Sequence, residues 1–162
     1  MSDPVTKIAT PMRLEYTVTA GRAQTAFLRG LVDGKFLGQR CPACRKVYCP
    51  PRGSCPTDGV PTEEVVECAG TGTVTTFCVV NVPFRGQALE LPYVCAQLLL
   101  DGADISFMAL IQGVPAAGVR MGMRVEAVWA PAEERTPSLE SVRWFQPSGE
   151  PDADYDSFKA YL

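Results

Sequence analysis

A chain of 162 residues with 46% hydrophobic and 20% charged side chains has a globular composition and is long enough for one domain, or for a small metal-binding module attached to a compact core. No apolar stretch approaches the roughly 20 residues of a membrane span, and the N-terminal residues lack the apolar centre of a signal peptide, so we expect a cytoplasmic protein. The net charge of −3 is unevenly spread: residues 1–52 carry nine Lys/Arg against three Asp/Glu, and the remainder carries six against fifteen, so the basic part is suited to an anionic ligand or partner.

The chain contains no histidine. This excludes histidine general bases, Ser/His/Asp and Cys/His nucleophile systems, and every metal site with a histidine ligand. The seven cysteines are an odd number, and Cys68, Cys78 and Cys95 are scattered through apolar, strand-like segments. We therefore interpret these three as buried thiols and not as part of a secreted disulfide framework.

The N-terminal part predicts an extended arm followed by one helix. Residues 12–21 alternate in a way that is typical of a short strand or an extended arm. From residue 23 to 33, apolar side chains that include Phe27 and Leu31 recur at helical spacing, and Gly34 or Gly38 is suited to end the helix. The apolar face of this amphipathic helix is either core or a docking surface for another protein.

Four of the seven cysteines lie close together after this helix. Cys41 and Cys44 form a Cys-x-x-Cys turn, and Cys55 and Asp58 form a second turn in which a carboxylate replaces the last thiolate. Structural zinc takes four tetrahedral ligands, and a carboxylate oxygen is a legitimate ligand beside thiolates. We predict zinc at these four side chains, with Cys49 as a competitor for the fourth position and a metal-free ribbon as the other alternative. Four protein ligands leave no position for a catalytic water, so the predicted role of the metal is structural.

The segment after the cysteine cluster predicts an all-β domain. Asp101 and Gly102 form a strong hairpin signal between two strand-like segments. Five strands with a short segment between the third and the fourth are typical of a small Greek-key barrel of the OB type. The strand-like stretches are residues 61–84, 92–113, 123–131 and 138–149.

The expected fold is mainly β, with an N-terminal helix, a rubredoxin-like zinc ribbon and a five-stranded OB-type barrel. We expect four parts along the chain. They are residues 1–37 (arm and amphipathic helix), 38–62 (zinc ribbon), 63–147 (OB-fold barrel) and 148–162 (acidic and aromatic tail).

Two apolar segments are candidates for contact with a partner. One is the long connection between strands at residues 81–94, which is rich in apolar side chains between two prolines. The other is the tail, in which aromatic residues alternate with acidic ones, and which is either a docking segment or simply solvated. The candidate contact residues are Phe84, Arg85, Tyr155, Phe158 and Tyr161.

The helix that leads into the cysteine cluster, the Pro-Pro-Arg step at residues 50–52 and the five-stranded barrel together resemble a known family. Over residues 20–147, the chain is similar to the zinc-ribbon-containing OB-fold proteins of domain-of-unknown-function family 35. The most specific parts of the resemblance are residues 38–59 and 72–84. The fourth ligand position is commonly cysteine in that family, so Asp58 departs from its pattern.

The resemblance implies a non-catalytic accessory subunit. Proteins of this family assemble with thiolase-superfamily enzymes, which include thiolases and steroid side-chain retro-aldolases that act on acyl-CoA. The implied complex is a hetero-oligomer built on the partner's dimer, with the catalytic residues in the partner and a structural zinc in the small subunit, which helps to form the CoA channel. The basic side chains near the ribbon are suited to the phosphates of a CoA thioester, or are solvated charges. They are Arg40, Arg45, Lys46 and Arg52.

Two other functions fit parts of the sequence. OB barrels and zinc ribbons also bind nucleic acid, but the acidic excess of the barrel half repels phosphate. An acyl-CoA enzyme with Cys49, Cys78 or Cys95 as its nucleophile would lack a neighbouring base to hold the thiolate. We therefore expect no catalytic residue in this chain, and neither nucleic acid nor a membrane among its partners.

Overall fold

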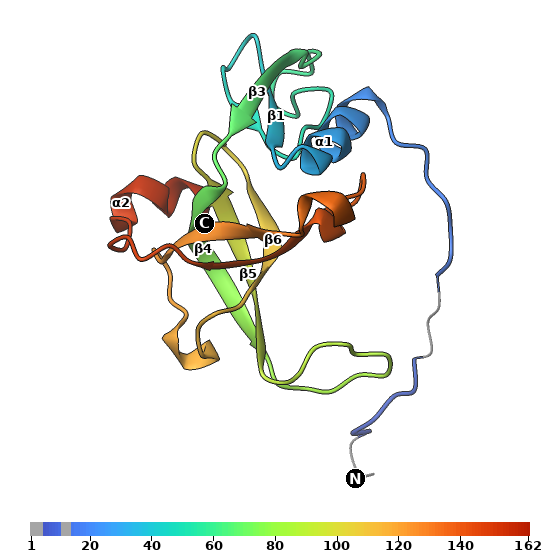
Figure 1. The fold of residues 1–162 in the computed structure, drawn as a ribbon, viewed down its shortest axis with the longest axis vertical. Helices are drawn as coiled ribbons and strands as arrows, with labels where there is room; N and C mark the ends of the chain where they lie inside the picture. Colours follow the sequence, from blue (N-terminus) through green and yellow to red (C-terminus); the bar gives the residue numbers. More distant parts are fainter. Residues whose placement is uncertain (1–4, 11–13) are drawn as a thin grey trace.

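The structure is a computed structural model that describes residues 5–10 and 14–162. An N-terminal helix and a small three-stranded sheet sit at one end of a closed five-stranded barrel (Figure 1). The predicted fold is confirmed. The predicted arm over residues 12–21 lies partly outside the described residues, and from residue 14 to Gly21 the chain forms neither helix nor strand. No helix among the described residues is long and apolar enough to cross a membrane.

The N-terminal helix packs on the core. α1 (Arg22–Val32) begins after Gly21, and beyond its end Gly34 adopts a φ of 72°, which favours glycine and reverses the chain toward the first strand. Phe27 and Leu31 are buried in the same core as the barrel side chains. This face of the helix is therefore core and not a free docking surface.

The small sheet carries the cysteine cluster. β1 (Phe36–Arg40) lies between β2 (Val47–Tyr48) and β3 (Glu64–Cys68), and both pairings are antiparallel. β3 falls within the residues 63–147 that the sequence analysis assigned to the barrel, yet it pairs with β1 over its whole length. The β-branched run therefore divides between two sheets, because residue alternation indicates a strand without indicating its neighbour.

The barrel is closed and nearly all antiparallel. Its strand order is β4-β5-β6-β8-β7, β4 also pairs with β7, and only the contact between β6 and β8 is parallel. A 3₁₀ turn at Ala116–Gly118 lies between β6 and β7, as predicted, and Asp101 and Gly102 lie in the β5–β6 turn. The barrel strands are β4 (Thr71–Val80), β5 (Tyr93–Leu100), β6 (Ser106–Ile111), β7 (Arg124–Trp129) and β8 (Val142–Pro147).

Aromatic side chains join the small sheet to the barrel. The ring of Phe36, from β1, lies 4.8 Å from Trp129 and 6.0 Å from Phe145, measured between ring centroids. Phe107 from β6 completes the group, with its centroid 6.3 Å from that of Phe36. Aromatic pairs at such separations stabilise beyond the area they bury. The ribbon sheet is therefore held on the barrel by a shared core.

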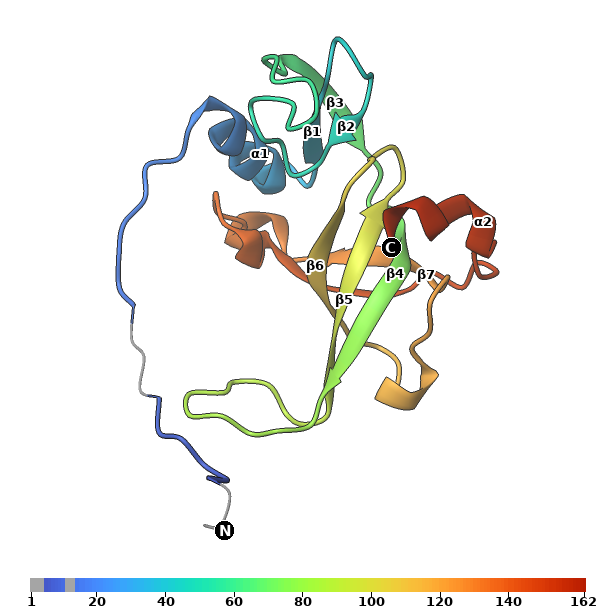
Figure 2. The same ribbon diagram turned by 180° about the vertical axis from the view of Figure 1, so that it is seen from behind.

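The C-terminal segment folds back beside the barrel, near β4 and β5 (Figure 2). It contains α2 (Tyr155–Phe158) and a 3₁₀ turn at Lys159–Tyr161. Phe158 is 3% exposed, so its prediction as a partner-facing residue is wrong. The side chain fills a hollow of the chain's own barrel, since burying a phenylalanine stabilises by about 2 kcal/mol relative to leaving it in water.

One carboxylate connects three distant parts of the chain. Oδ2 of Asp104, in the turn after β5, accepts a hydrogen bond from the backbone N–H of Val47 at 2.8 Å. Its Oδ1 accepts one from the hydroxyl of Tyr161 at 3.1 Å. The ribbon, the β5–β6 turn and the C-terminal segment therefore meet at this side chain.

β4 runs on beyond its pairing with β7, and a long projecting loop, residues 81–92, connects it to β5 (Figures 1 and 2). β7 pairs with β4 only from Thr71 to Thr73. Phe84, at 58% exposure, and Arg85 both lie in the exposed part of this loop. The loop therefore projects from the barrel at the end opposite the ribbon (Figures 1 and 2).

Candidate metal centre

The first turn of the centre runs from Cys41 to Lys46. The backbone N–H of Cys44 points at Sγ of Cys41 at 3.4 Å. The turn is closed by two backbone bonds, from Arg45 N–H to the Cys41 carbonyl at 3.1 Å and from Cys41 N–H to the Lys46 carbonyl at 2.9 Å. Arg45 adopts a φ of 66°, the one positive value outside glycine among the described residues.

The second turn, from Cys55 to Val60, repeats this geometry. The backbone N–H of Asp58 points at Sγ of Cys55 at 3.4 Å. Gly59 donates to the Cys55 carbonyl at 2.9 Å, and Cys55 donates to the Val60 carbonyl at 2.8 Å. Asp58 therefore holds the place in this turn that Cys44 holds in the first.

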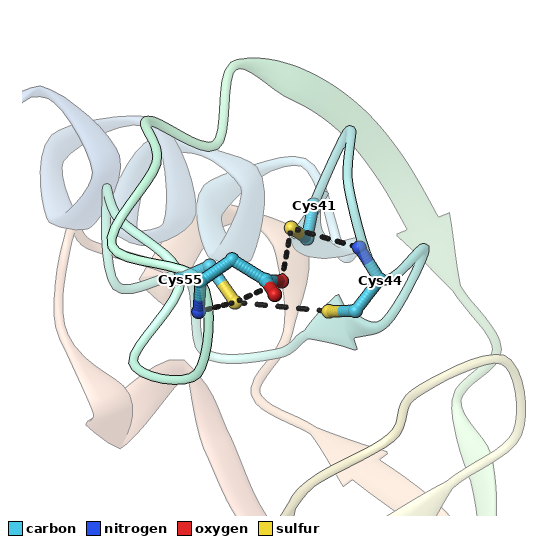
Figure 3. Close-up of side chains that lie close together, drawn as sticks. Cys41, Cys44 and Cys55 are labelled. Atoms are coloured by element: carbon cyan, nitrogen blue, oxygen red, sulfur yellow. Dashed lines mark hydrogen bonds between the residues drawn. The ribbon is translucent and has the colours of Figure 1, made fainter.

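The two turns bring four donor atoms together (Figure 3). The three sulfurs and a carboxylate oxygen of Asp58 all lie within 4.8 Å of one another. Oδ2 of Asp58 lies 3.2 Å from the sulfurs of both Cys41 and Cys55, and Sγ of Cys44 lies 3.7 Å from that of Cys55. Ligand atoms about 2.0–2.3 Å from a tetrahedral zinc lie roughly 3.3–3.8 Å apart, so the four donors fit this ion.

The contacts within the cluster shift the pKa values of its members in different directions. Hydrogen bonds from the thiols of Cys44, Cys55 and Cys41 hold the pKa of Asp58 below its usual range. Burial would raise the pKa of the Cys55 thiol, but hydrogen bonds from the Tyr48 hydroxyl and the Asp58 amide outweigh burial and lower it. The same contact with Asp58 raises the pKa of the Cys44 thiol to about 11. Zinc requires its ligands to be deprotonated, so metal binding would release the protons that the thiols donate to Asp58.

Tyr48 contacts the cysteine cluster directly. It is buried beside Cys41 and Cys55, and its hydroxyl lies 3.2 Å from Sγ of Cys55. The hydrogen bond to Cys55, with burial, raises the pKa of Tyr48 to about 12. The sequence did not indicate a role for Tyr48. Tyr48 is the last residue of β2. Tyrosine is common in strands, so its presence there gave no sign of a role in metal binding.

Cys49 does not join the metal centre. It is 0% exposed, packs in the core shared by helix and barrel, and hydrogen-bonds with Cys68, which together with burial raises its pKa. Asp58 and not Cys49 is the fourth side chain of the cluster. Of the three scattered cysteines predicted to be buried, Cys68 is buried, Cys95 is half-buried and Cys78 is exposed, so the prediction is wrong for Cys78.

The four basic candidates divide into two pairs. Arg40 and Arg45 both reach Glu64, at 3.0 and 3.4 Å. Lys46 and Arg52 instead line a hollow of about 500 Å³ with the last residues of the chain. Among the described residues, no ion pair joins either of these two to an acidic side chain. The second pair is therefore without an acidic partner in the described chain, although the carboxylate of Asp104 lines the same hollow.

The partner-facing candidates are also spread over separate surfaces. Phe84 and Arg85 project on the long loop, and Tyr155 is 56% exposed on α2. Tyr161 is half-buried and bound to Asp104. The structure does not bring these residues together with the basic ones, except that Tyr161 also borders the hollow of Lys46 and Arg52.

Comparison with known proteins agrees with this two-module arrangement. Residues 29–64 match the family model described as "ChsH2, rubredoxin-like zinc ribbon domain", and residues 65–130 match "ChsH2, C-terminal OB-fold domain". A "DUF35 domain-containing scaffold protein" from Methanocaldococcus jannaschii is 37% identical over 101 residues, which are 61% of this chain and 70% of that protein. The chain belongs to the DUF35 family.

This DUF35 chain is also similar to one further curated protein and to two solved structures. It is 34% identical over 96 residues to a "Probable enoyl-CoA hydratase alpha subunit" from Thermomonospora curvata, of whose length it spans only 29%. Its fold matches a chain of an "Ltp2-ChsH2(DUF35) aldolase" at 27% identity and a TM-score of 0.62, covering 82% of this chain and 99% of that one. A DUF35 protein of unknown function from Sulfolobus solfataricus, 19% identical with a TM-score of 0.62, shares the fold over 79% of this chain and 87% of its own.

Proposed function

We propose that the protein is a non-catalytic accessory subunit that assembles with a thiolase-like enzyme acting on acyl-CoA. The observation that carries this proposal is its similarity, over 99% of the matched chain, to a component of an Ltp2-ChsH2(DUF35) aldolase. The scaffold role in the name of the Methanocaldococcus relative supports the same reading. As the specific substrate of the complex, we propose a CoA thioester of a steroid side chain. We further propose that the complex belongs to lipid metabolism and is cytoplasmic.

The residues of this chain support a role without catalysis. No histidine is present to serve as a general base. The metal cluster has four protein donors, so a bound zinc would keep no position for water or substrate, and its contribution would be to hold the ribbon together. Cys49 is enclosed in the core, and burial raises the pKa of Cys95, so neither is an activated nucleophile.

We propose that the basic side chains near the ribbon contact CoA phosphates in the complex. Lys46 and Arg52 are the first choice, because they line an open hollow and because a guanidinium binds phosphate through two parallel hydrogen bonds. Arg40 and Arg45 are the second choice, since both lie against Glu64 and would have to exchange that contact for phosphate.

We propose that the partner binds the projecting loop and the exposed side of α2. Phe84 supplies an exposed aromatic ring and Arg85 a flexible charge, a combination that is common in interfaces. Tyr155 supplies a second exposed ring. Phe158 is excluded from this surface by its burial.

A tagged copy purified from the native host tests the proposal. Mass spectrometry of the stoichiometric companions should identify a thiolase-superfamily protein, and the same sample should contain about one zinc per chain. The rate at which the companion turns over CoA thioesters should be higher with this chain present than without it. A lone protein, or one that carries oligonucleotide with a salt-sensitive affinity, would replace the proposal with a nucleic-acid-binding role.

Variants separate the two surfaces. Phe84→Asp should weaken assembly, whereas Leu139→Asp, at another exposed position, should leave it intact. Lys46→Ala with Arg52→Ala should raise the KM for the CoA thioester without dissociating the complex. Lys35→Ala is the matched control, since it removes an exposed charge that lies near the ribbon and pairs with Glu67.

A further inference from the structure

Two cysteines outside the metal centre face each other across the projecting strands. Cys78 of β4 and Cys95 of β5 are directly opposite in the antiparallel register. Opposite residues point to the same face of a sheet, and their Cα atoms lie about 4.5–5.5 Å apart. Disulfides span Cα separations of about 4.4–6.8 Å, so the backbone already satisfies this requirement.

Both side chains lie on the outer face of the barrel. Val94 and Ala96, the neighbours of Cys95 along β5, are buried in the core, so Cys95 between them points outward. Cys78 is exposed and Cys95 is half-buried. A small solute can therefore reach Cys78 directly, and Cys95 lies beside it.

We propose that Cys78 and Cys95 form a reversible disulfide when the protein meets a small-molecule disulfide such as oxidised glutathione. This modification site does not depend on the proposed function of the protein. It uses no residue of the metal centre and needs no movement of the barrel core.

The chemistry proceeds by thiol–disulfide exchange in two steps. The thiolate of Cys78 attacks one sulfur of oxidised glutathione, forms a mixed disulfide and releases one glutathione thiolate. The thiolate of Cys95 then attacks the Cys78 sulfur and releases the second glutathione. Two protein thiols are oxidised to one disulfide, and their two protons and two electrons leave with two molecules of reduced glutathione.

The environment sets the order of these steps. Burial, and then the negative charge of a Cys78 thiolate, raise the pKa of Cys95. Cys95 is thus the poorer first nucleophile. Once Cys78 is in a mixed disulfide, its negative charge is gone and ionisation of Cys95 becomes easier. The exposed cysteine therefore reacts first and the half-buried one completes the bond.

The bond would act on the projecting loop. Residues 79–94 lie between the two cysteines and include the whole connection from β4 to β5. β4 has no strand partner other than β5 beyond the short pairing with β7, within the described chain. A disulfide at this point would hold the two strands together where the loop begins, and would restrict the movement of the loop relative to the barrel.

Peptide mapping of the zinc-loaded full-length protein tests the proposal. After incubation with oxidised glutathione, alkylation and trypsin digestion without reductant, we expect residues 53–85 and 86–120 to elute as one joined peptide, because trypsin cleaves after Arg52, Arg85 and Arg120. The intact protein should lose two hydrogen atoms, and dithiothreitol should restore both. Fragmentation of the joined peptide should place the bond at Cys78.

Matched variants distinguish this bond from others. The peptide 53–85 also contains Cys55 and Cys68, so Cys68→Ser should keep the joined peptide and Cys78→Ser should abolish it. A stable glutathione adduct on Cys78 without the joined peptide, a disulfide between two protein molecules, or a bond through Cys55 with loss of zinc would each overturn the proposal. The wild-type fragmentation decides the matter even if a serine variant fails to fold.

Discussion

Arg45 and Gly59 occupy the same position in the two metal-binding turns, one residue after the last ligand, with φ values of 66° and 67°. Each donates its backbone N–H to the carbonyl of the first cysteine of its turn. Glycine adopts this left-handed conformation freely, whereas a residue with a Cβ is disfavoured there. The first turn is therefore strained where the second is relaxed.

Replacing Arg45 with glycine should stabilise the ribbon. We expect Arg45→Gly to increase the free energy of unfolding of the zinc-loaded protein by about 1 kcal/mol, because the left-handed penalty disappears and the exposed ion pair with Glu64 contributes little. Gly59→Ala should have the opposite sign. Urea denaturation measures both. Ala43→Gly, in the same turn, is the control. If Arg45→Gly lowered the free energy of unfolding as much as this control does, the backbone at Arg45 would not be strained.

The fourth ligand should control how tightly the centre holds zinc. Asp58→Cys should increase zinc affinity, since the turn already has the backbone geometry of its Cys44 counterpart. Asp58→Ala should weaken it by more than the roughly 10- to 100-fold that loss of an outer-shell partner costs. Competition with a chromophoric chelator measures the affinities. Glu63→Ala, an exposed carboxylate outside the turns, should leave the affinity unchanged, and an Asp58→Ala protein that behaves like this control would refute the assignment.

Phe158 and Tyr155 lie in edge-to-face contact, 5.6 Å apart between ring centroids, yet they should respond differently to truncation. Phe158→Ala should reduce the free energy of unfolding by about 3 kcal/mol, because it leaves a cavity beside the barrel. Tyr155→Ala should stay within about 1 kcal/mol, as an exposed substitution. Thermal denaturation compares them, and equal effects would show that the C-terminal segment is detached in solution.

Tyr161 should make stability depend on pH in the alkaline range. Burial, and then its hydrogen bond to Asp104, raise its pKa, so the folded protein holds the phenol proton more tightly than the unfolded chain. This contribution is complete below the unfolded pKa of about 10 and is lost as the pH rises through the higher folded value.

The stability advantage of the wild type over Tyr161→Phe should therefore decrease above about pH 10. Chemical denaturation of both proteins across that range measures the difference. Tyr155→Phe, at an exposed position on the same segment, is the matched control. A difference that stays constant with pH would mean that the hydroxyl of Tyr161 is free of Asp104 in solution.

Local patterns were sufficient for the two turns of the metal centre and for most strands. Two ligand pairs with equal spacing predict two matched turns, and the Asp101-Gly102 step predicts the β5–β6 hairpin, because both signals depend on residues that are neighbours in sequence. The choice between Asp58 and Cys49 needed the structure. Cys49 is diverted into the core by contacts with Cys68, which is remote in sequence.

The features that the sequence did not reveal have the same origin. β3 pairs with β1 and Phe158 packs on the barrel through contacts between distant segments, which alternation and composition do not reveal. Cys78 lies in an apolar strand, but it is exposed because it is opposite Cys95 on the outer face of the barrel. Asp104 was missed because an acidic residue near a turn is ordinary, and its three-way role appears only once Val47 and Tyr161 are beside it.

The contact between Phe36 and Trp129 gives the molecule an internal optical probe. Trp129 belongs to the barrel, Phe36 belongs to the strand that carries Cys41 at its end, and the guanidinium of Arg135 lies 5.5 Å from the centre of the indole. Indole emission depends on its immediate surroundings. In a protein whose other tryptophan, Trp144, is replaced, fluorescence from the barrel would thus follow metal uptake by the ribbon in real time, without any added label.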